Sequence, residues 1–99
     1  MKYKRFEALP VWQDAAELVR AIYEFTLLEP FRRYGSLRDQ LERAALSVSN
    51  NIAEGFERGT TNELLAFLYI ARGSVGEVRS MMRLLERWKL FGNCKSQIS

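Results

Sequence analysis

The side chains best suited to chemistry gather around position 50, where basic, acidic, amide and hydroxyl groups alternate. At about 100° per residue along a helix, four of them share one face beside an apolar stripe. Two nearby arginines could hold the carboxylate of Glu54 as a general acid or base. The full set consists of Arg43, Ser47, Asn50, Asn51, Glu54 and Arg58.

A structural role explains this cluster better than catalysis does. The chain contains no histidine, which removes the commonest general base and metal ligand. No second clustered carboxylate accompanies Glu54, and no nucleophile lies in the pattern beside a base. We therefore interpret the set as a hydrogen-bonded network that fixes how two helices meet. We predict no enzyme activity, no catalytic residue, no metal site and no cofactor.

Four arginines near the C-terminus form the pattern with the clearest functional meaning. They fall within about 80° of one another around a helix axis and extend along roughly 22 Å of it. Such a row matches the phosphate spacing of a nucleic-acid backbone. A solvated face, partly neutralised by Glu77 and Glu86, explains it equally well. The row consists of Arg72, Arg79, Arg83 and Arg87.

A second basic segment lies at the N-terminus. Residues 1–5 carry three positive charges, on Lys2, Lys4 and Arg5, and no negative one. The interleaved Tyr3 and Phe6 could stack on bases, or could pack onto a neighbouring subunit. Residues 6–59 hold six basic and nine acidic side chains, and residues 60–99 hold six and three, so the excess positive charge lies at the two ends of the chain.

Apolar residues at spacings of three and four predict three helices, over about 10–28, 36–55 and 61–90. Pro10 suits the first turn of the first helix, and Pro30 should end it. Ser36 with Asp39 resembles a capping box for the second helix. Gly55 is expected to cap its C-terminus in a left-handed conformation.

The third helix is expected to begin at a fuller capping box, formed by Thr60 and Glu63. It contains Gly73 and Gly76, which we attribute to close approach of a neighbouring helix backbone, since glycine costs about 1 kcal/mol inside a helix. Thirty residues reach about 45 Å, so this helix outreaches its partners. A fourth helix, beginning at about residue 94, or another subunit should cover the exposed part.

These elements predict an all-α protein with one domain over residues 1–99, folded as an antiparallel up-and-down four-helix bundle. The period-two alternation of strands is nowhere sustained. The apolar runs are much shorter than the roughly 20 residues that span a bilayer, and no signal-peptide pattern follows the basic N-terminus. A single cysteine, Cys94, is compatible with a reducing compartment. We therefore expect a cytoplasmic protein.

Three segments resemble the bacterial four-helix-bundle family encoded by intervening sequences within 23S ribosomal RNA genes. The resemblance implies a cytoplasmic homopentamer with no known enzymatic activity. In a related branch, the accessory proteins of diversity-generating retroelements, a basic pentamer binds nucleic acid and the reverse transcriptase. The segments are Phe6-x-x-Leu9-x-Val11-Trp12-Gln13-x-Ala15, Gln40-x-x-Arg43-Ala44-x-x-Ser47-x-x-x-Asn51-Ile52-Ala53-Glu54-Gly55-x-x-Arg58 and Phe67-x-x-Ile70-Ala71-x-Gly73-Ser74-x-x-Glu77.

Residues and resemblance together predict a non-enzymatic oligomer that binds RNA or DNA through its basic surface. The arginine row and the basic N-terminal segment would carry the contacts. The alternative is a protein-interaction scaffold, such as an accessory protein that recruits a reverse transcriptase.

Overall fold

The computed structural model describes residues 2–28, 31 and 33–88, and their regular secondary structure is helical with no strand among them. A short 3-10 helix, η1 (Phe6–Ala8), precedes α1 (Pro10–Thr26), α2 (Gly35–Glu57) and α3 (Thr61–Trp88). The all-α class and the three predicted helices are therefore confirmed. The predicted end of the third helix at residue 90 and the predicted fourth helix from residue 94 lie outside the described residues.

Two of the predicted helix starts are confirmed, and local chemistry explains both. Pro10 is the first residue of α1, where its missing N–H leaves no hydrogen bond unmade. At α3, the backbone N–H of Glu63 donates to the Thr60 hydroxyl at 3.1 Å, and that hydroxyl donates to the Glu63 carboxylate at 3.0 Å. This reciprocal pair satisfies one of the amide groups that a helix leaves unpaired at its start.

The first helix ends at Thr26, two residues before the predicted end at residue 28. The N–H groups of Leu27 and Leu28 bond to carbonyls three residues back, so the chain tightens and leaves the α-helical path. Thr26 is buried, and its hydroxyl bonds both the Tyr23 carbonyl and the Glu42 carboxylate of α2, at 3.1 and 2.6 Å. Contact with α2 therefore fixes the end of α1 at Thr26, four residues before Pro30 in the sequence.

The second helix is longer than predicted, and both of its predicted caps are wrong. Tyr34 is the N-cap without a side-chain hydrogen bond, so Ser36 already lies in the first turn, too late to cap it. Gly55 is helical and buried, and α2 continues to Glu57. The left-handed glycine is Gly59, with φ of 89°, in the turn that leads to α3.

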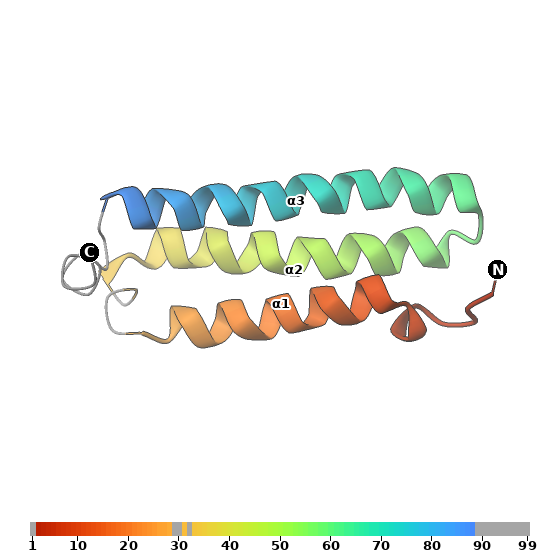
Figure 1. Cartoon of the computed structure of the whole chain (residues 1–99), viewed down its shortest axis with the longest axis horizontal. Helices are drawn as coiled ribbons and strands as arrows, with labels where there is room; N and C mark the ends of the chain where they lie inside the picture. Colours follow the sequence, from red (N-terminus) through yellow and green to blue (C-terminus); the bar gives the residue numbers. More distant parts are fainter. Residues whose placement is uncertain (1, 29–30, 32, 89–99) are drawn as a thin grey trace.

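The three helices form a flat layer about 50 × 25 × 19 Å in extent, with α2 between α1 and α3. Each helix runs antiparallel to its neighbour, so α1 and α3 run in the same direction along the two edges (Figure 1). The α2 helix packs against both of the others. Short connections between antiparallel helices produce this arrangement.

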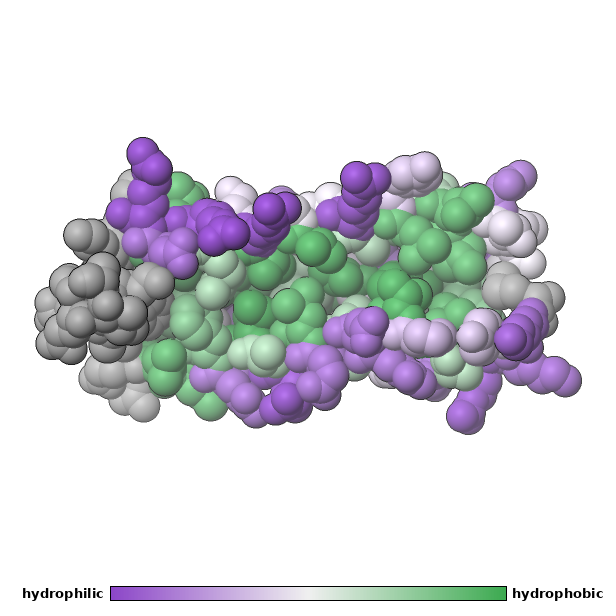
Figure 2. Space-filling view, in the orientation of Figure 1, coloured by the Kyte–Doolittle hydropathy of each residue, from purple (hydrophilic) through white to green (hydrophobic). Residues whose placement is uncertain are grey.

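The core lies where the apolar faces of the three helices converge on α2. Leu41, Ala45 and Ile52 of α2 are at most 1% exposed, although they lie in the middle of a single layer. Side chains from α1 and α3 close over them. One apolar cluster includes Ile22, Phe31 and Val78 with the first half of α2, and a second surrounds the last half. One face of the layer carries a band of apolar side chains between polar rows over α3 and α1 (Figure 2).

Candidate functional site

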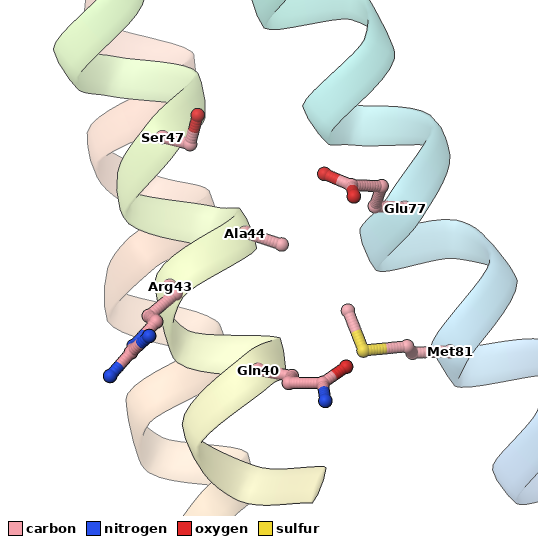
Figure 3. Close-up of a pocket in the computed structure, with 6 residues that line it drawn as sticks. All are labelled: Gln40, Arg43, Ala44, Ser47, Glu77 and Met81. Atoms are coloured by element: carbon pink, nitrogen blue, oxygen red, sulfur yellow. The ribbon is translucent and has the colours of Figure 1, made fainter.

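A groove of about 310 Å³ runs between α2 and α3. In Figure 3, Glu77 and Met81 reach from α3 toward α2, whereas the Arg43 side chain turns away from the gap. Most of the lining side chains belong to the segments on which the family resemblance rests, so those separate segments meet at one surface. The lining residues are Gln40, Arg43, Ala44, Ser47, Glu77 and Met81.

Hydroxyl groups join the two helices at one end of this groove. The Ser47 and Ser74 hydroxyls lie 2.9 Å apart, within hydrogen-bonding distance across the α2–α3 interface. The side-chain amide of Asn51 donates to both the carbonyl and the hydroxyl of Ser47, at 2.8 and 2.9 Å. Ser74 is 6% exposed, so its hydroxyl lies beside the Ser47 hydroxyl instead of bulk water. These hydrogen bonds connect α2 to α3.

A separate ion-pair cluster lies at the turn between α2 and α3. The Arg58 guanidinium is 3.1 Å from the Glu54 carboxylate and 3.7 Å from that of Glu63. It also lies over the Phe67 ring, 5.1 Å from the centroid. All three charged side chains are roughly half exposed, so each pair contributes little to the free energy of unfolding. Arg58 thus connects the end of α2 to the start of α3.

The structure therefore divides the six residues predicted to form one polar network. Ser47 and Asn51 join Ser74, whereas Glu54 and Arg58 pair with each other and with Glu63. Arg43 and Asn50 are both exposed on α2. Sequence reasoning missed Gln40, Glu77 and Met81 as groove residues. The spacings Gln40-x-x-Arg43 and Ser74-x-x-Glu77 each place two residues on one face of a helix. The contact between these two faces depends on the register of α2 against α3, which the spacings do not encode.

The arginine row lies along the outer edge of α3. Arg72, Arg79, Arg83 and Arg87 are all exposed. Arg83 makes an ion pair with Glu86 at 3.3 Å, and its side chain remains 69% exposed. Glu77, the other predicted counter-charge, lies in the groove toward α2. Glu77 therefore does not neutralise the row as predicted, and the row carries more net positive charge than expected.

The basic N-terminal segment lies at the other end of the layer from the last turns of α3 (Figure 1). Lys2, Lys4 and Arg5 are exposed. Phe6 packs edge-on against Trp12 with ring centroids 5.3 Å apart, and both pack on the core around Ile52. A single subunit does not combine the N-terminal charges with Arg83 and Arg87 into one patch.

The glycines of α3 do not have the predicted role within the described part of the chain. A Cβ atom added at Gly73 or Gly76 would meet nothing within 4 Å in the described part of the molecule. The close approach of α2 and α3 occurs instead at Gly55, where an added Cβ would lie 2.6 Å from the Phe67 Cβ. Gly73 and Gly76 are exposed on α3, so no helix of the described chain accounts for them.

The outer edge of α1 carries the opposite charge from that of α3. Arg20 lies between two carboxylates, 2.9 Å from Glu17 and 2.7 Å from Glu24. The hydrogen bonds and charge of Arg20 lower the pKa of Glu17, and the carboxylates raise the pKa of Arg20 above its usual value. Two carboxylates against one guanidinium leave this group with one net negative charge.

Two features are absent from the residues that the structure describes. Among residues 2–28, 31 and 33–88, no three histidine, cysteine or acidic side chains come together in a way that could hold a metal ion. Within the same ranges, no helix combines the length and hydropathy required to cross a membrane.

A layer of antiparallel helices with charged outer edges defines an all-α protein. The model of the 23S rRNA-intervening sequence protein family matches residues 7–97, nearly the whole chain. The chain belongs to this family, as the sequence resemblance predicted. No curated protein and no solved structure shows a significant match.

Proposed function

We propose that this protein is a non-catalytic, oligomeric nucleic-acid-binding protein of the cytoplasm, and that the arginine row of α3 contacts the phosphate backbone of structured RNA. The observation that carries this proposal is the exposure of Arg72, Arg79, Arg83 and Arg87 along one edge of the layer. A guanidinium group remains charged at all physiological pH values and donates two parallel hydrogen bonds to a phosphate.

The geometry of the row suits a backbone rather than a base sequence. Arg79, Arg83 and Arg87 are separated by one helical turn each, about 6 Å, which is close to the phosphate spacing along one strand. Double-helical RNA is recognised mainly through its shape and backbone. The family name refers to an intervening sequence of 23S ribosomal RNA, which makes a 23S fragment the first RNA to test.

We further propose that the complete fold is a four-helix bundle, with the fourth helix between α1 and α3. Two series of apolar side chains, each spaced by seven residues, lie along the edges of the uncovered band: Val11, Leu18 and Phe25 of α1, and Leu68, Val75 and Met82 of α3. Val11 and Val75 are 45% and 42% exposed. Such spacing is typical of the seams that receive another helix.

Assembly into a homopentamer, implied by the family resemblance, would explain how a modest charge excess suffices for binding. Each subunit supplies one arginine row and one N-terminal segment with Lys2, Lys4 and Arg5. These lie at opposite ends of the subunit, so an assembly of several copies presents several basic segments to one RNA. Several weak contacts to one RNA then act together and raise the overall affinity.

A charge-reversal experiment tests the role of the row. Arg79→Glu with Arg83→Glu should lower the affinity for a 23S ribosomal RNA fragment at least tenfold in a mobility-shift assay. The matched control reverses Arg33 and Arg43, which are also exposed, and so changes the net charge equally. The control should retain most of the affinity. Equal losses in both variants would show that only net charge matters, and the proposal for the row would be wrong.

A protein-interaction scaffold is the second candidate function, favoured by exposed apolar residues such as Tyr69 and Ile70, which are 70% and 51% exposed. The partner would be a reverse transcriptase, as in the related accessory proteins. Co-purification with a purified reverse transcriptase, before and after nuclease treatment, separates the candidates. A complex that survives nuclease favours the scaffold, whereas one that dissolves indicates contact through nucleic acid.

A further inference from the structure

The first half of α3 exposes large apolar side chains on the face that points away from α2. Leu65 and Tyr69 are 49% and 70% exposed. They lie four residues apart, so their side chains neighbour each other along about one turn of the helix. Contiguous exposed apolar surface of this kind marks an interaction site in a soluble protein.

Two hollows follow this patch along the same face. Gly73 and Gly76 lie one and two turns after Tyr69, and an added Cβ at either would meet nothing within 4 Å in the part of the chain that the structure describes. Glycine destabilises the interior of a helix relative to alanine. Since no described helix of the same chain uses the space, the hollows match the approach of a helix from outside.

The charges at the two edges of the layer indicate which helix approaches. The outer edge of α3 carries Arg72 beside the patch, whereas the outer edge of α1 carries the Glu17–Arg20–Glu24 group with its net negative charge. The two edges are therefore complementary in charge.

The directions of the helices permit this contact between identical copies. The α1 and α3 helices run the same way at opposite edges of the layer (Figure 1). The α1 edge of one copy can therefore lie along the α3 edge of the next copy without any reversal. The pair then keeps one free edge of each kind, and such a head-to-tail contact forms a closed ring or an open chain.

We infer that the outer face of α3 around Tyr69, Gly73 and Gly76 is the surface on which a second copy of this chain docks its α1 edge. The inference rests on the oligomeric state in the proposed function and assigns its interface. It places Arg72 at the contact between subunits, opposite Glu17. Arg79, Arg83 and Arg87 extend beyond the apolar patch and remain available for nucleic acid.

The test begins with the size of the full chain, measured by light scattering coupled to gel filtration. Gly76→Leu fills one hollow without a clash inside the subunit, so it should fold with unchanged helical circular dichroism yet lose the assembly. The matched control is Gly35→Leu, which adds the same side chain where a Cβ also meets nothing within 4 Å. It should remain assembled. A Gly76→Leu protein that assembles like the wild type overturns the inference.

A mixing experiment tests the head-to-tail arrangement. The double variant Glu17→Arg, Glu24→Arg should also be monomeric, because its α1 edge would repel Arg72. Each variant retains the edge that the other has lost, so an equimolar mixture with Gly76→Leu should form a heterodimer and nothing larger. A mixture that stays monomeric, or a double variant that still assembles, contradicts the assignment of α1.

The outcomes separate this inference from the proposed function. If the arginine row binds RNA but Gly76→Leu assembles like the wild type, the proposed interface is wrong and the proposed function is unaffected. Disassembly of Gly76→Leu, with a wild-type protein that binds no RNA, rejects nucleic-acid binding and leaves the interface standing.

Discussion

Gly55 of α2 and Phe67 of α3 approach so closely that a Cβ atom added at the glycine would lie 2.6 Å from the Phe67 Cβ. The same atom would be 3.3 Å from the Cα of Leu64, which belongs to the backbone of α3. Neither group can move aside without shifting the helix. This contact fixes the distance between α2 and α3 near their connecting turn, where the ion pairs of Arg58 also lie.

We therefore expect Gly55→Ala to destabilise the fold. Alanine favours a helix over glycine by about 1 kcal/mol, but overpacking a tight contact costs about 1–3 kcal/mol. The net loss in the free energy of unfolding should be up to about 2 kcal/mol, measured by urea denaturation. Gly35→Ala is the control, since its new methyl group meets nothing within 4 Å. A Gly55→Ala protein more stable than the wild type would contradict the tight contact.

The capping box of α3 gives a second prediction. Thr60→Ala removes the hydroxyl that accepts from the Glu63 N–H at 3.1 Å. Loss of such a cap costs about 0.5–2 kcal/mol, which thermal denaturation followed by circular dichroism can detect. Thr61→Ala alters the adjacent exposed threonine and should change the stability by only a few tenths of a kcal/mol. Equal effects at both positions would exclude a capping role for Thr60.

The hydroxyl pair across the α2–α3 interface should show coupling in a double-mutant cycle. Ser47→Ala and Ser74→Ala each remove one side of the 2.9 Å contact. The double variant should lose less stability than the sum of the two single variants, by about 0.5–1.5 kcal/mol. Denaturant unfolding of the four proteins measures this difference. Strict additivity would mean that the two hydroxyls do not interact in solution.

The edge of α1 predicts a weak acid dependence. The Arg20 hydrogen bonds lower the pKa of Glu17 from its model-compound value of 4.5. A carboxyl with a lowered folded pKa stabilises the fold above its unfolded pKa and ceases to do so as the pH falls through the folded value. Glu17→Gln should therefore show a smaller drop in melting temperature between pH 7 and pH 3 than the wild type. An unchanged drop would show that Glu17 and Arg20 are not paired in solution.

The existence of the three helices could be predicted from the sequence because apolar residues recur at helical spacing, but two glycine roles could not. Gly55 resembled a helix cap, and its true role depends on how closely α3 approaches. Gly73 and Gly76 suggested a neighbouring helix, and the described chain places none there. In each case the sequence shows where a glycine lies, whereas only the packing shows whether another backbone comes close to it.

The candidate site likewise combines features that one helix encodes with features that depend on how two helices pack. The helical face shared by Arg43 and Ser47 follows from spacing within one helix. That Ser74 and Glu77 meet this face depends on the register of α2 against α3, which no local pattern encodes. The arginine row could be predicted because all of its residues lie on one helix, and the structure adds only that Glu77 faces the groove instead of the row.

The salt dependence of RNA binding tests the central proposal most directly. Fluorescence anisotropy with a labelled 23S ribosomal RNA fragment should give an affinity that falls steeply between about 50 and 200 mM salt, because phosphate contacts release bound cations. Reversal of Arg79 and Arg83 should make this dependence shallower, by roughly one to two units in the logarithmic slope. A wild-type protein that does not bind at 50 mM salt, or whose affinity is insensitive to salt, would contradict nucleic-acid binding through the arginine row.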